Sequence, residues 1–134
     1  MLYRLVFVSD LIGPARQSRQ AQAEIVGQAI GTNRRDEISG AMLFHAGQVL
    51  QMVEGARVDL DRLMRRLEAD GRHADLRVLA DRPVMHRRAT EPMRMGRATP
   101  DQVEAILGGR DMAELEVSVL ERLLCGDVRD DIAA

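Results

Sequence analysis

Aromatic side chains are almost missing from this chain of 134 residues, which contains one tyrosine, two phenylalanines and no tryptophan. Proteins that bind single-stranded nucleic acid stack the bases on aromatic side chains, and so few aromatics provide no such platform. Lysine is absent as well, so all 19 basic residues are arginines, and they are scattered among 21 acidic residues for a formal net charge of -2. Because no basic segment is available to contact phosphates, we expect no nucleic-acid partner.

The chain has a single cysteine, Cys125, and therefore forms no intrachain disulfide. No histidine or basic cluster beside Cys125 would lower its pKa, so we expect a buried structural thiol rather than a reactive one. No apolar run approaches the roughly 20 residues that span a bilayer. The first residues also lack the long apolar region and the cleavage site of a signal peptide. We therefore expect a cytoplasmic protein without a membrane partner.

Nothing in the sequence predicts an enzyme. The three histidines, His45, His73 and His86, do not share the spacing of metal ligands on one helix, so we expect no metal site. Ser9 has no obvious base, and the glycines do not form a phosphate-binding loop before a helix. We expect no catalytic residues.

Short β-rich segments predict four strands, at residues 2–8, 38–44, 49–53 and 76–80. Apolar residues at helical spacing predict one helix over 19–30, ended by Gly31, and another over 58–69. The order β-α-β-β-α-β is typical of a ferredoxin-like α+β fold. Residues 82–98 show no clear pattern.

Two additional helices are predicted near the C-terminus. Thr99, Pro100 and Gln102 form a capping-box sequence that begins a helix reaching Leu107. A second helix is predicted over residues 111–125, and the acidic tail from 127 to 134 is expected to fray. The apolar faces of these helices require a cover, either the free face of the sheet or a second protomer.

Several polar residues have two interpretations when the residues are considered alone. Gln51 shares one face of its strand with Val49 and Val53. An unpaired buried amide costs about 1–3 kcal/mol, so Gln51 requires a partner: a backbone group, water or a ligand. Asn33 follows a predicted helix end and resembles a cap, and Arg66 and Asp70, four residues apart, could form a surface pair.

The local sequence strings, taken in order, resemble the BLUF family of flavin-binding blue-light sensors. Leu2-Tyr-Arg-Leu-Val-Phe-Val-Ser9 is similar to the opening strand of that family. Asn33, Ile38-Ser-Gly40 with the following Ala-Met-Leu-Phe-His-Ala-Gly47, and Val49-Leu-Gln-Met-Val-Glu-Gly55 resemble its second and third segments. Asp70-Gly-Arg-His73 and Pro83 continue the resemblance, which covers about residues 1–96.

The resemblance implies an FAD whose flavin ring lies between the two helices that cross the sheet. Asn33 matches the asparagine that hydrogen-bonds the ring, and Gln51 matches the glutamine whose amide rearranges in light. Ile25 and Leu67 match apolar positions that flank the ring. The remaining cofactor positions are polar: Arg66, Asp70 and Thr32, the last where many members carry a second asparagine.

One position departs from the family in a way that bears on function. The light reaction of the family begins with electron transfer from a tyrosine on the first strand, and this chain has Phe7 there. Phenylalanine has no hydroxyl, and Tyr3, four residues earlier on the same face, is about 13 Å away along the strand. Either Met93 or Met95 takes the position of a methionine of the family.

Three hypotheses follow from the resemblance and this departure. The first is an FAD-binding sensory domain of the blue-light photoreceptor family without the tyrosine-based photocycle. The second is a flavin-free protein-interaction module, and the third is an unrelated ferredoxin-like domain. We expect residues 1–98 to form the flavin-binding core and residues 99–134 to be a helical extension of the same domain. A separate effector protein is the expected partner, with the C-terminal helices as a candidate surface for homo-oligomers.

Overall fold

The computed structural model describes residues 1–126, and the tail predicted to fray, residues 127–134, lies outside them. Short 3-10 helices occupy Gly13–Arg16 and Met112–Glu114. The regular elements along the chain are β1 (Leu2–Leu11), α1 (Arg19–Arg35), β2 (Ser39–His45), β3 (Gln48–Ala56), α2 (Arg57–Ala69), β4 (His73–Val84), β5 (Arg94–Met95), α3 (Pro100–Leu107) and α4 (Val117–Cys125).

The predicted ferredoxin-like α+β fold is confirmed. The sheet has the order β4-β1-β3-β2-β5, and β1 is antiparallel to both of its neighbours. Strands β2 and β3 form a hairpin, whose turn residues Ala46 and Gly47 both have positive φ angles. Strand β5, which the sequence did not indicate, adds two residues parallel to β2.

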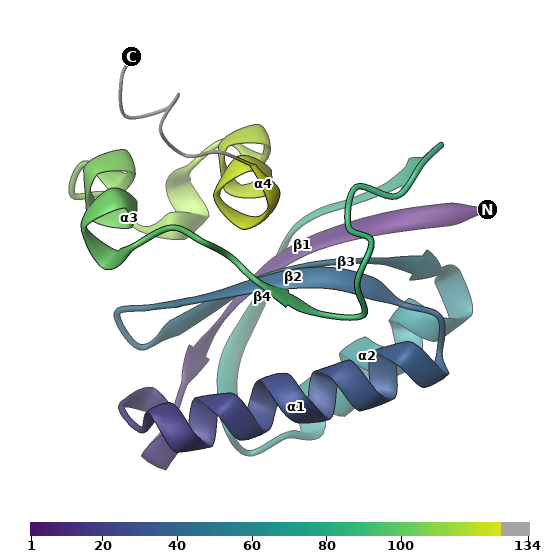
Figure 1. Ribbon diagram of the computed structural model, residues 1–134, viewed down its shortest axis with the longest axis horizontal. Helices are drawn as coiled ribbons and strands as arrows, with labels where there is room; N and C mark the ends of the chain where they lie inside the picture. Colours follow the sequence, from purple (N-terminus) through teal and green to yellow (C-terminus); the bar gives the residue numbers. More distant parts are fainter. Residues whose placement is uncertain (127–134) are drawn as a thin grey trace.

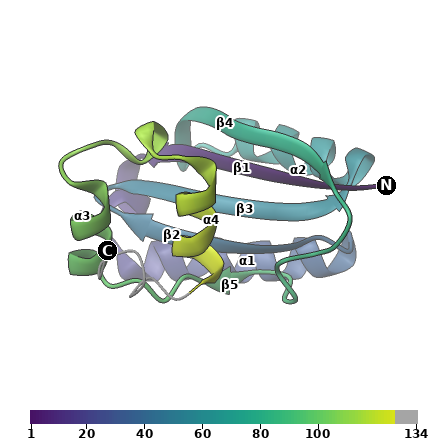
Figure 2. The same cartoon turned by 90° about the horizontal axis from the view of Figure 1, so that it is seen from above.

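Helices cover both faces of the sheet (Figure 1). Helices α1 and α2 cover one face, where Leu5 and Phe7 of β1 point. Seen from above, α3 and α4 lie over the opposite face (Figure 2), where they pack on Val6 and Val8. Successive side chains of β1 point to opposite faces of the sheet, so this strand contributes apolar residues to the hydrophobic core on each face.

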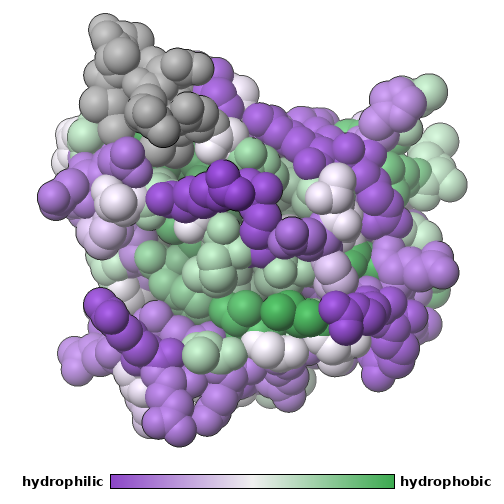
Figure 3. Space-filling model, viewed as in Figure 1, coloured by the Kyte–Doolittle hydropathy of each residue, from purple (hydrophilic) through white to green (hydrophobic). Residues whose placement is uncertain are grey.

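The sheet of the same chain covers the apolar face of the C-terminal helix α4. Leu120, Leu123 and Leu124 of α4 are almost completely buried within this chain, against the sheet. The apolar stripe that suggested a surface for homo-oligomers is thus part of the domain's own core. On the face shown in Figure 3, hydrophilic side chains surround a smaller apolar area in the middle of the molecule.

Three predicted boundaries are wrong. Helix α1 does not end at Gly31 but continues to Arg35, so Thr32 and Asn33 belong to its last turns. A glycine costs a helix only about 1 kcal/mol, which the packing of α1 on the sheet outweighs. Strand β4 is much longer than residues 76–80 because it pairs with β1 along nearly its whole length.

The third correction concerns the helix predicted over residues 111–125. Leu115 has an extended backbone (φ -81°, ψ 154°), which separates a 3-10 turn from α4, whose first residue is Val117. The capping box of α3 is confirmed, since Thr99 Oγ1 accepts from the Gln102 N–H at 3.2 Å. Within residues 1–126, no helix combines the length and apolar character needed to cross a membrane.

Candidate functional site

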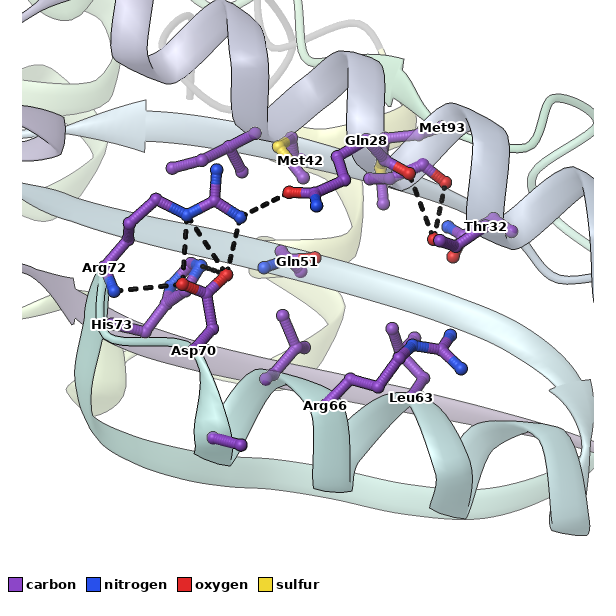
Figure 4. A pocket seen from close by; sticks show the side chains of 15 residues that line it. Gln28, Thr32, Met42, Gln51, Leu63, Arg66, Asp70, Arg72, His73 and Met93 are labelled. Carbon is purple, nitrogen blue, oxygen red and sulfur yellow. Dashed lines mark hydrogen bonds and ion pairs between the residues drawn. The ribbon is translucent and has the colours of Figure 1, made fainter.

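A cavity of about 410 Å³ opens between α1, α2 and the sheet (Figure 4). Helix α1 provides one wall, α2 and the start of β4 provide the other, and the sheet forms the floor. The residues that line it are Ile25, Gln28, Ala29, Thr32, Asn33, Met42, Gln51, Leu63, Arg66, Leu67, Ala69, Asp70, Arg72, His73 and Met93.

All seven residues predicted to contact a cofactor line this cavity. They are Ile25, Thr32, Asn33, Gln51, Arg66, Leu67 and Asp70. Seven- and eight-residue spacing places Ile25, Thr32 and Asn33 on one side of α1. Arg66 and Leu67 lie in the last turn of α2, and Asp70 is the residue that caps its C-terminal end. The helical periodicity of the sequence thus produces two facing walls above the strand that carries Gln51.

Gln51 is the polar centre of the cavity floor. Its residue is 3% exposed, and its side chain rises from β3 between the two helices (Figure 4). The Nε2 atom is buried and has no hydrogen-bond partner in the described part of the chain. A protein group therefore does not satisfy this donor, and a bound molecule would.

Asn33 is fully buried in the last turns of α1 rather than a residue beyond the helix end. Its Nδ2 donates to the carbonyl oxygen of Pro92 at 2.8 Å, which ties α1 to the segment before β5. Its Oδ1 is buried without a partner among the described residues. The cavity therefore contains an unsatisfied acceptor from Asn33 as well as an unsatisfied donor from Gln51.

Arg66 and Asp70 do not form the surface pair that their spacing suggested. Arg66 Nη2 lies 3.3 Å from Oδ2 of Asp36, a carboxylate that also contacts Arg35 and Arg62. Asp70 turns instead toward the other end of the cavity. The two side chains thus place opposite charges at separate points along the wall formed by α2.

Asp70 and Arg72 close one end of the cavity. The Arg72 guanidinium donates to Asp70 Oδ2 at 2.6 Å and also to Gln28 Oε1 on α1, so it bridges the two walls (Figure 4). The side-chain hydrogen bonds from Arg72 hold the pKa of Asp70 below its ordinary value, with smaller contributions from the Arg72 N–H and nearby charges. Sequence reasoning did not identify Gln28 or Arg72 as site residues.

His73 is a third residue that the sequence did not indicate. Its Nδ1 lies 3.0 Å from Ser9 Oγ, and its Nε2 is buried, 3.9 Å from Asp70 Oδ2 and without a hydrogen bond. Burial lowers the pKa of His73, which therefore favours the neutral imidazole; the Asp70 carboxylate opposes this shift. Ser9 thus has a partner after all, but its residue is fully buried and outside the cavity lining, where no substrate can reach the hydroxyl.

Phe7 lies under the cavity and not in its lining. It is fully buried and is the register partner of Gln51 across β1 and β3. The ring of Tyr3 lies further along the same face. The guanidinium carbon of Arg57 lies over this ring, 4.8 Å from its centroid. The residue of β1 that pairs with Gln51 therefore carries no phenolic hydroxyl.

Of the two methionines that matched one position, Met93 contributes to the cavity. Met93 is 5% exposed and lines the cavity, whereas Met95 is 39% exposed in β5. Met42 of β2, directly paired with Gln51, provides a second thioether in the lining. The site therefore combines apolar walls, two unsatisfied amide atoms and charged groups toward its rim.

Comparison with known proteins shows which proteins this chain is similar to. Over 82 residues the chain is 35% identical to a photoactivated adenylate cyclase subunit beta-like protein of Euglena gracilis, and 34% identical to the subunit beta of Euglena longa. These matches cover 61% of this chain and 10% of either relative. The chain therefore corresponds to a small part of those proteins.

Solved structures share the fold. The ground state of BlsA superposes with a TM-score of 0.80 over 95% of this chain and 90% of BlsA, at 19% identity, which shows the fold alone. The BLUF domain of BlrP1 gives a TM-score of 0.62 at 30% identity, over 71% of this chain and 64% of that one.

A sequence profile of one family spans most of the described chain. It matches residues 2–96, the part that forms the sheet, α1 and α2, and its description is "Sensors of blue-light using FAD". A match over more than half of the chain, together with the structural neighbours, establishes that the chain belongs to the BLUF family of blue-light sensors.

Proposed function

We propose that the cavity between α1 and α2 binds FAD, and that Phe7 deprives the bound flavin of the light reaction typical of the family. The observation that carries this proposal is the pair of buried, unpartnered amide atoms, Gln51 Nε2 and Asn33 Oδ1. One donates and the other accepts, so their ligand needs an acceptor and a donor close together. The oxidised flavin ring has both, since carbonyl oxygens and ring nitrogens accept and one ring N–H donates.

The shape and composition of the walls support a flat, largely apolar ligand. Ile25 of α1 and Leu67 of α2 both line the cavity, and so does Leu63. A volume of about 410 Å³ is within the range typical of small-molecule sites, which combine apolar walls with a few polar groups. In this proposal Ile25 and Leu67 flank the ring, while Gln51 and Asn33 hold its polar edge.

The charged residues of the wall suit the rest of the cofactor. Arg66 and Asp70 line the cavity at separate points, and Thr32 adds a hydroxyl that already donates to the Gln28 carbonyl oxygen at 3.1 Å. We assign Arg66, Asp70 and Thr32 to hydrogen bonds with the cofactor beyond its apolar rings. The Asn33 Nδ2 atom remains on Pro92, so Asn33 can hold the flavin and the segment before β5 together.

Phe7 determines what light can do in this site. The family's reaction needs a tyrosine beside the glutamine, which delivers an electron and then the proton of its hydroxyl. Phe7 has no hydroxyl, so it has no such proton and is a much poorer electron donor. The one tyrosine of the chain, Tyr3, pairs with Gly55, four residues along β3 from Gln51. We therefore assign this domain to flavin binding without the tyrosine-based photocycle.

A flavin-free interaction module is the less favoured alternative. A domain that has lost its cofactor gains nothing from two buried, unsatisfied amide atoms, each of which costs about 1–3 kcal/mol. Substitution of Gln51 or Asn33 by an apolar residue would remove that cost. The presence of both amides in one cavity favours a ligand.

The family is one of sensors, and residues 2–96 form a sensor domain rather than an enzyme. Relatives include photoactivated adenylate cyclase subunits and a bacterial light-regulated adenylyl cyclase. We infer that the domain likewise acts on an effector, here a separate protein, and that it does so in the cytoplasm, where the thiol of Cys125 stays reduced. We also infer that residues 99–134 extend the core formed by residues 1–98 within one domain.

A titration with FAD tests the proposal. We expect flavin fluorescence to report saturable binding of one FAD per chain, weakened about tenfold or more in Gln51→Leu, which removes one hydrogen bond to the ring. Gln48→Leu is the matched control, because Gln48 lies on the same strand outside the cavity and donates to Asp10. Absence of FAD binding by the unmodified protein, or equal weakening by both variants, would contradict the proposal.

A further inference from the structure

Two buried carboxylates lie on the face of the sheet opposite the cavity. Glu54 of β3 is completely buried and Glu121 of α4 is 4% exposed. Burial of a charge is unfavourable unless hydrogen bonds and opposite charges compensate it, so these residues require partners. Their partners are in β1, β4 and the segment between β4 and β5.

Glu54 binds the backbone of the segment that follows β4. Its carboxylate accepts from the N–H groups of Arg88 and Ala89 at 2.9 and 2.8 Å, and from Nε of Arg4 at 2.8 Å. These bonds hold residues 88–89 against the sheet. Figure 2 shows the chain turning from the end of β4 across the end of the sheet toward β5.

Glu121 connects the same segment to the C-terminal helix. It accepts from Arg88 Nη1 at 3.0 Å and from Arg82 Nη2 at 2.7 Å. Arg88 is therefore bound twice, by its backbone to Glu54 and by its side chain to Glu121. Any movement of α4 away from the sheet breaks the second of these links.

The other end of the segment reaches the cavity. The Pro92 carbonyl accepts from Asn33, the Glu91 carbonyl accepts from the Gly40 N–H at 3.0 Å, and Met93 lines the cavity. The approach is close, since a Cβ added at Gly40 would meet Met93 Cε at 3.3 Å and the Met52 carbonyl oxygen at 2.6 Å. Residues 88–93 thus connect α4 to Asn33, whose Oδ1 is the unsatisfied acceptor in the cavity.

We propose that Glu54 and Glu121 are positioning residues for the cavity on the other face of the sheet, and that they couple flavin binding to the docking of α4. This inference rests on the proposed function, because it concerns binding at the same site. Both carboxylates bind the first residues of segment 88–93. The last residues of this segment bind Asn33, through the Pro92 carbonyl, and place Met93 in the cavity lining. A cavity whose Asn33 is held in place binds the ring better than one whose Asn33 is free to turn.

The coupling acts in both directions by thermodynamic necessity. If docking of α4 strengthens flavin binding by some factor, flavin strengthens docking of α4 by the same factor. An effector that draws α4 from the sheet would thus lower the affinity for flavin, and a bound flavin would oppose that effector. Such a mechanism gives the sensor an output that does not require Tyr at position 7.

The variant Arg88→Gln tests the coupling, because it removes the bridge to Glu121 and keeps the backbone N–H that Glu54 accepts. We expect the dissociation constant for FAD to rise about tenfold, a typical size for coupling between two sites. The flavin absorption band should also shift, since it responds to hydrogen bonds on the ring. Glu121→Gln should give the same two effects from the other partner.

The matched control is Glu104→Gln on α3. Glu104 also ties the C-terminal helices to the sheet, through His45 at 2.6 Å, but it does not contact residues 88–93. We expect FAD affinity and the absorption band to stay unchanged in this variant. A similar loss of affinity in Glu104→Gln would mean that general loosening of the helices, and not the bridge, is responsible, which would overturn the proposal.

Hydrogen exchange separates failure of this inference from failure of the proposed function. Without flavin, Arg88→Gln should speed exchange at the Ala89 and Gly40 amides, which Glu54 and Glu91 hold. If the unmodified protein binds no FAD, the proposed function fails while this measurement still tests the link. Unchanged exchange in Arg88→Gln, or unchanged FAD affinity in a protein that binds FAD, would overturn the coupling.

Discussion

Phe7 and Gln51 are direct partners across β1 and β3, and both side chains belong to the face covered by α1 and α2. Paired residues on antiparallel strands have Cβ atoms about 4.5–5.5 Å apart, so a substituent on the Phe7 ring would lie in the surroundings of the Gln51 amide. The strand register therefore makes position 7 the place from which a hydroxyl could act on Gln51.

Phe7→Tyr should give the domain a light response. In the FAD-loaded variant we expect a reversible red shift of the flavin absorption band under blue light, because the new hydroxyl can donate an electron and a proton next to Gln51. Phe44→Tyr is the control, since Phe44 packs on the same side of the sheet but pairs with Val49. The assignment of Phe7 is wrong if FAD-loaded Phe7→Tyr stays unresponsive to light, or if Phe44→Tyr responds equally.

Gln51→Leu should have opposite effects on stability and on binding. In the absence of flavin we expect the free energy of unfolding to rise by about 1 kcal/mol, because the substitution removes a buried, unpartnered donor. Affinity for FAD should fall at the same time. Urea denaturation without flavin measures the first effect, and a loss of stability in Gln51→Leu would show that its amide is satisfied within the protein.

His73 should make stability depend on pH below about 7. Burial lowers the pKa of His73 below its ordinary value of about 6.5, so below that pH the unfolded chain binds the extra proton first. The free energy of unfolding should therefore fall as the pH drops through this range. Asp70, whose pKa is also lowered, keeps its stabilising contribution until the pH approaches about 4.

His73→Asn should flatten this pH dependence, because asparagine does not titrate. The control is His86→Asn, since His86 is exposed. Urea denaturation at pH 7, 6 and 5 measures the difference between the slopes. Equal slopes for His73→Asn and the unmodified protein would contradict the assignment of a buried, neutral His73.

Leu120→Ala should destabilise the whole domain by about 2–5 kcal/mol, since Leu120 of α4 is completely buried against the sheet. We expect one cooperative transition, seen equally by circular dichroism and by FAD release. This result would support the inference that residues 99–134 belong to the same domain as residues 1–98. Separate transitions for α4 and for the FAD site would contradict it.

The regular part of this fold could be predicted because its signals are local. Alternation placed Gln51 on a covered face with Val49 and Val53, and helical spacing placed Ile25 and Leu67 on apolar faces. Gln51, Ile25 and Leu67 line one cavity because the order of strands and helices leaves few ways to assemble their elements. The capping box at Thr99 was equally local and equally predictable.

Other features depend on contacts between distant residues and left no local signal. Arg72 meets Gln28, 44 positions away, and Asn33 meets Pro92, 59 positions away. The continuation of α1 past Gly31 likewise depends on packing against the sheet, which overrides the low helix propensity of glycine. Residues 82–98 gave no pattern because Glu54, Glu121 and Asn33, rather than their own periodicity, determine their course.

The most direct test is an absorption spectrum of the purified protein, taken after incubation with excess FAD and desalting, first in the dark and then under blue light. We expect one equivalent of retained flavin, with an absorption band that is the same in both conditions. Loss of the flavin on desalting would contradict the binding site formed by Asn33 and Gln51. A reversible red shift in the unmodified protein would contradict the role assigned to Phe7.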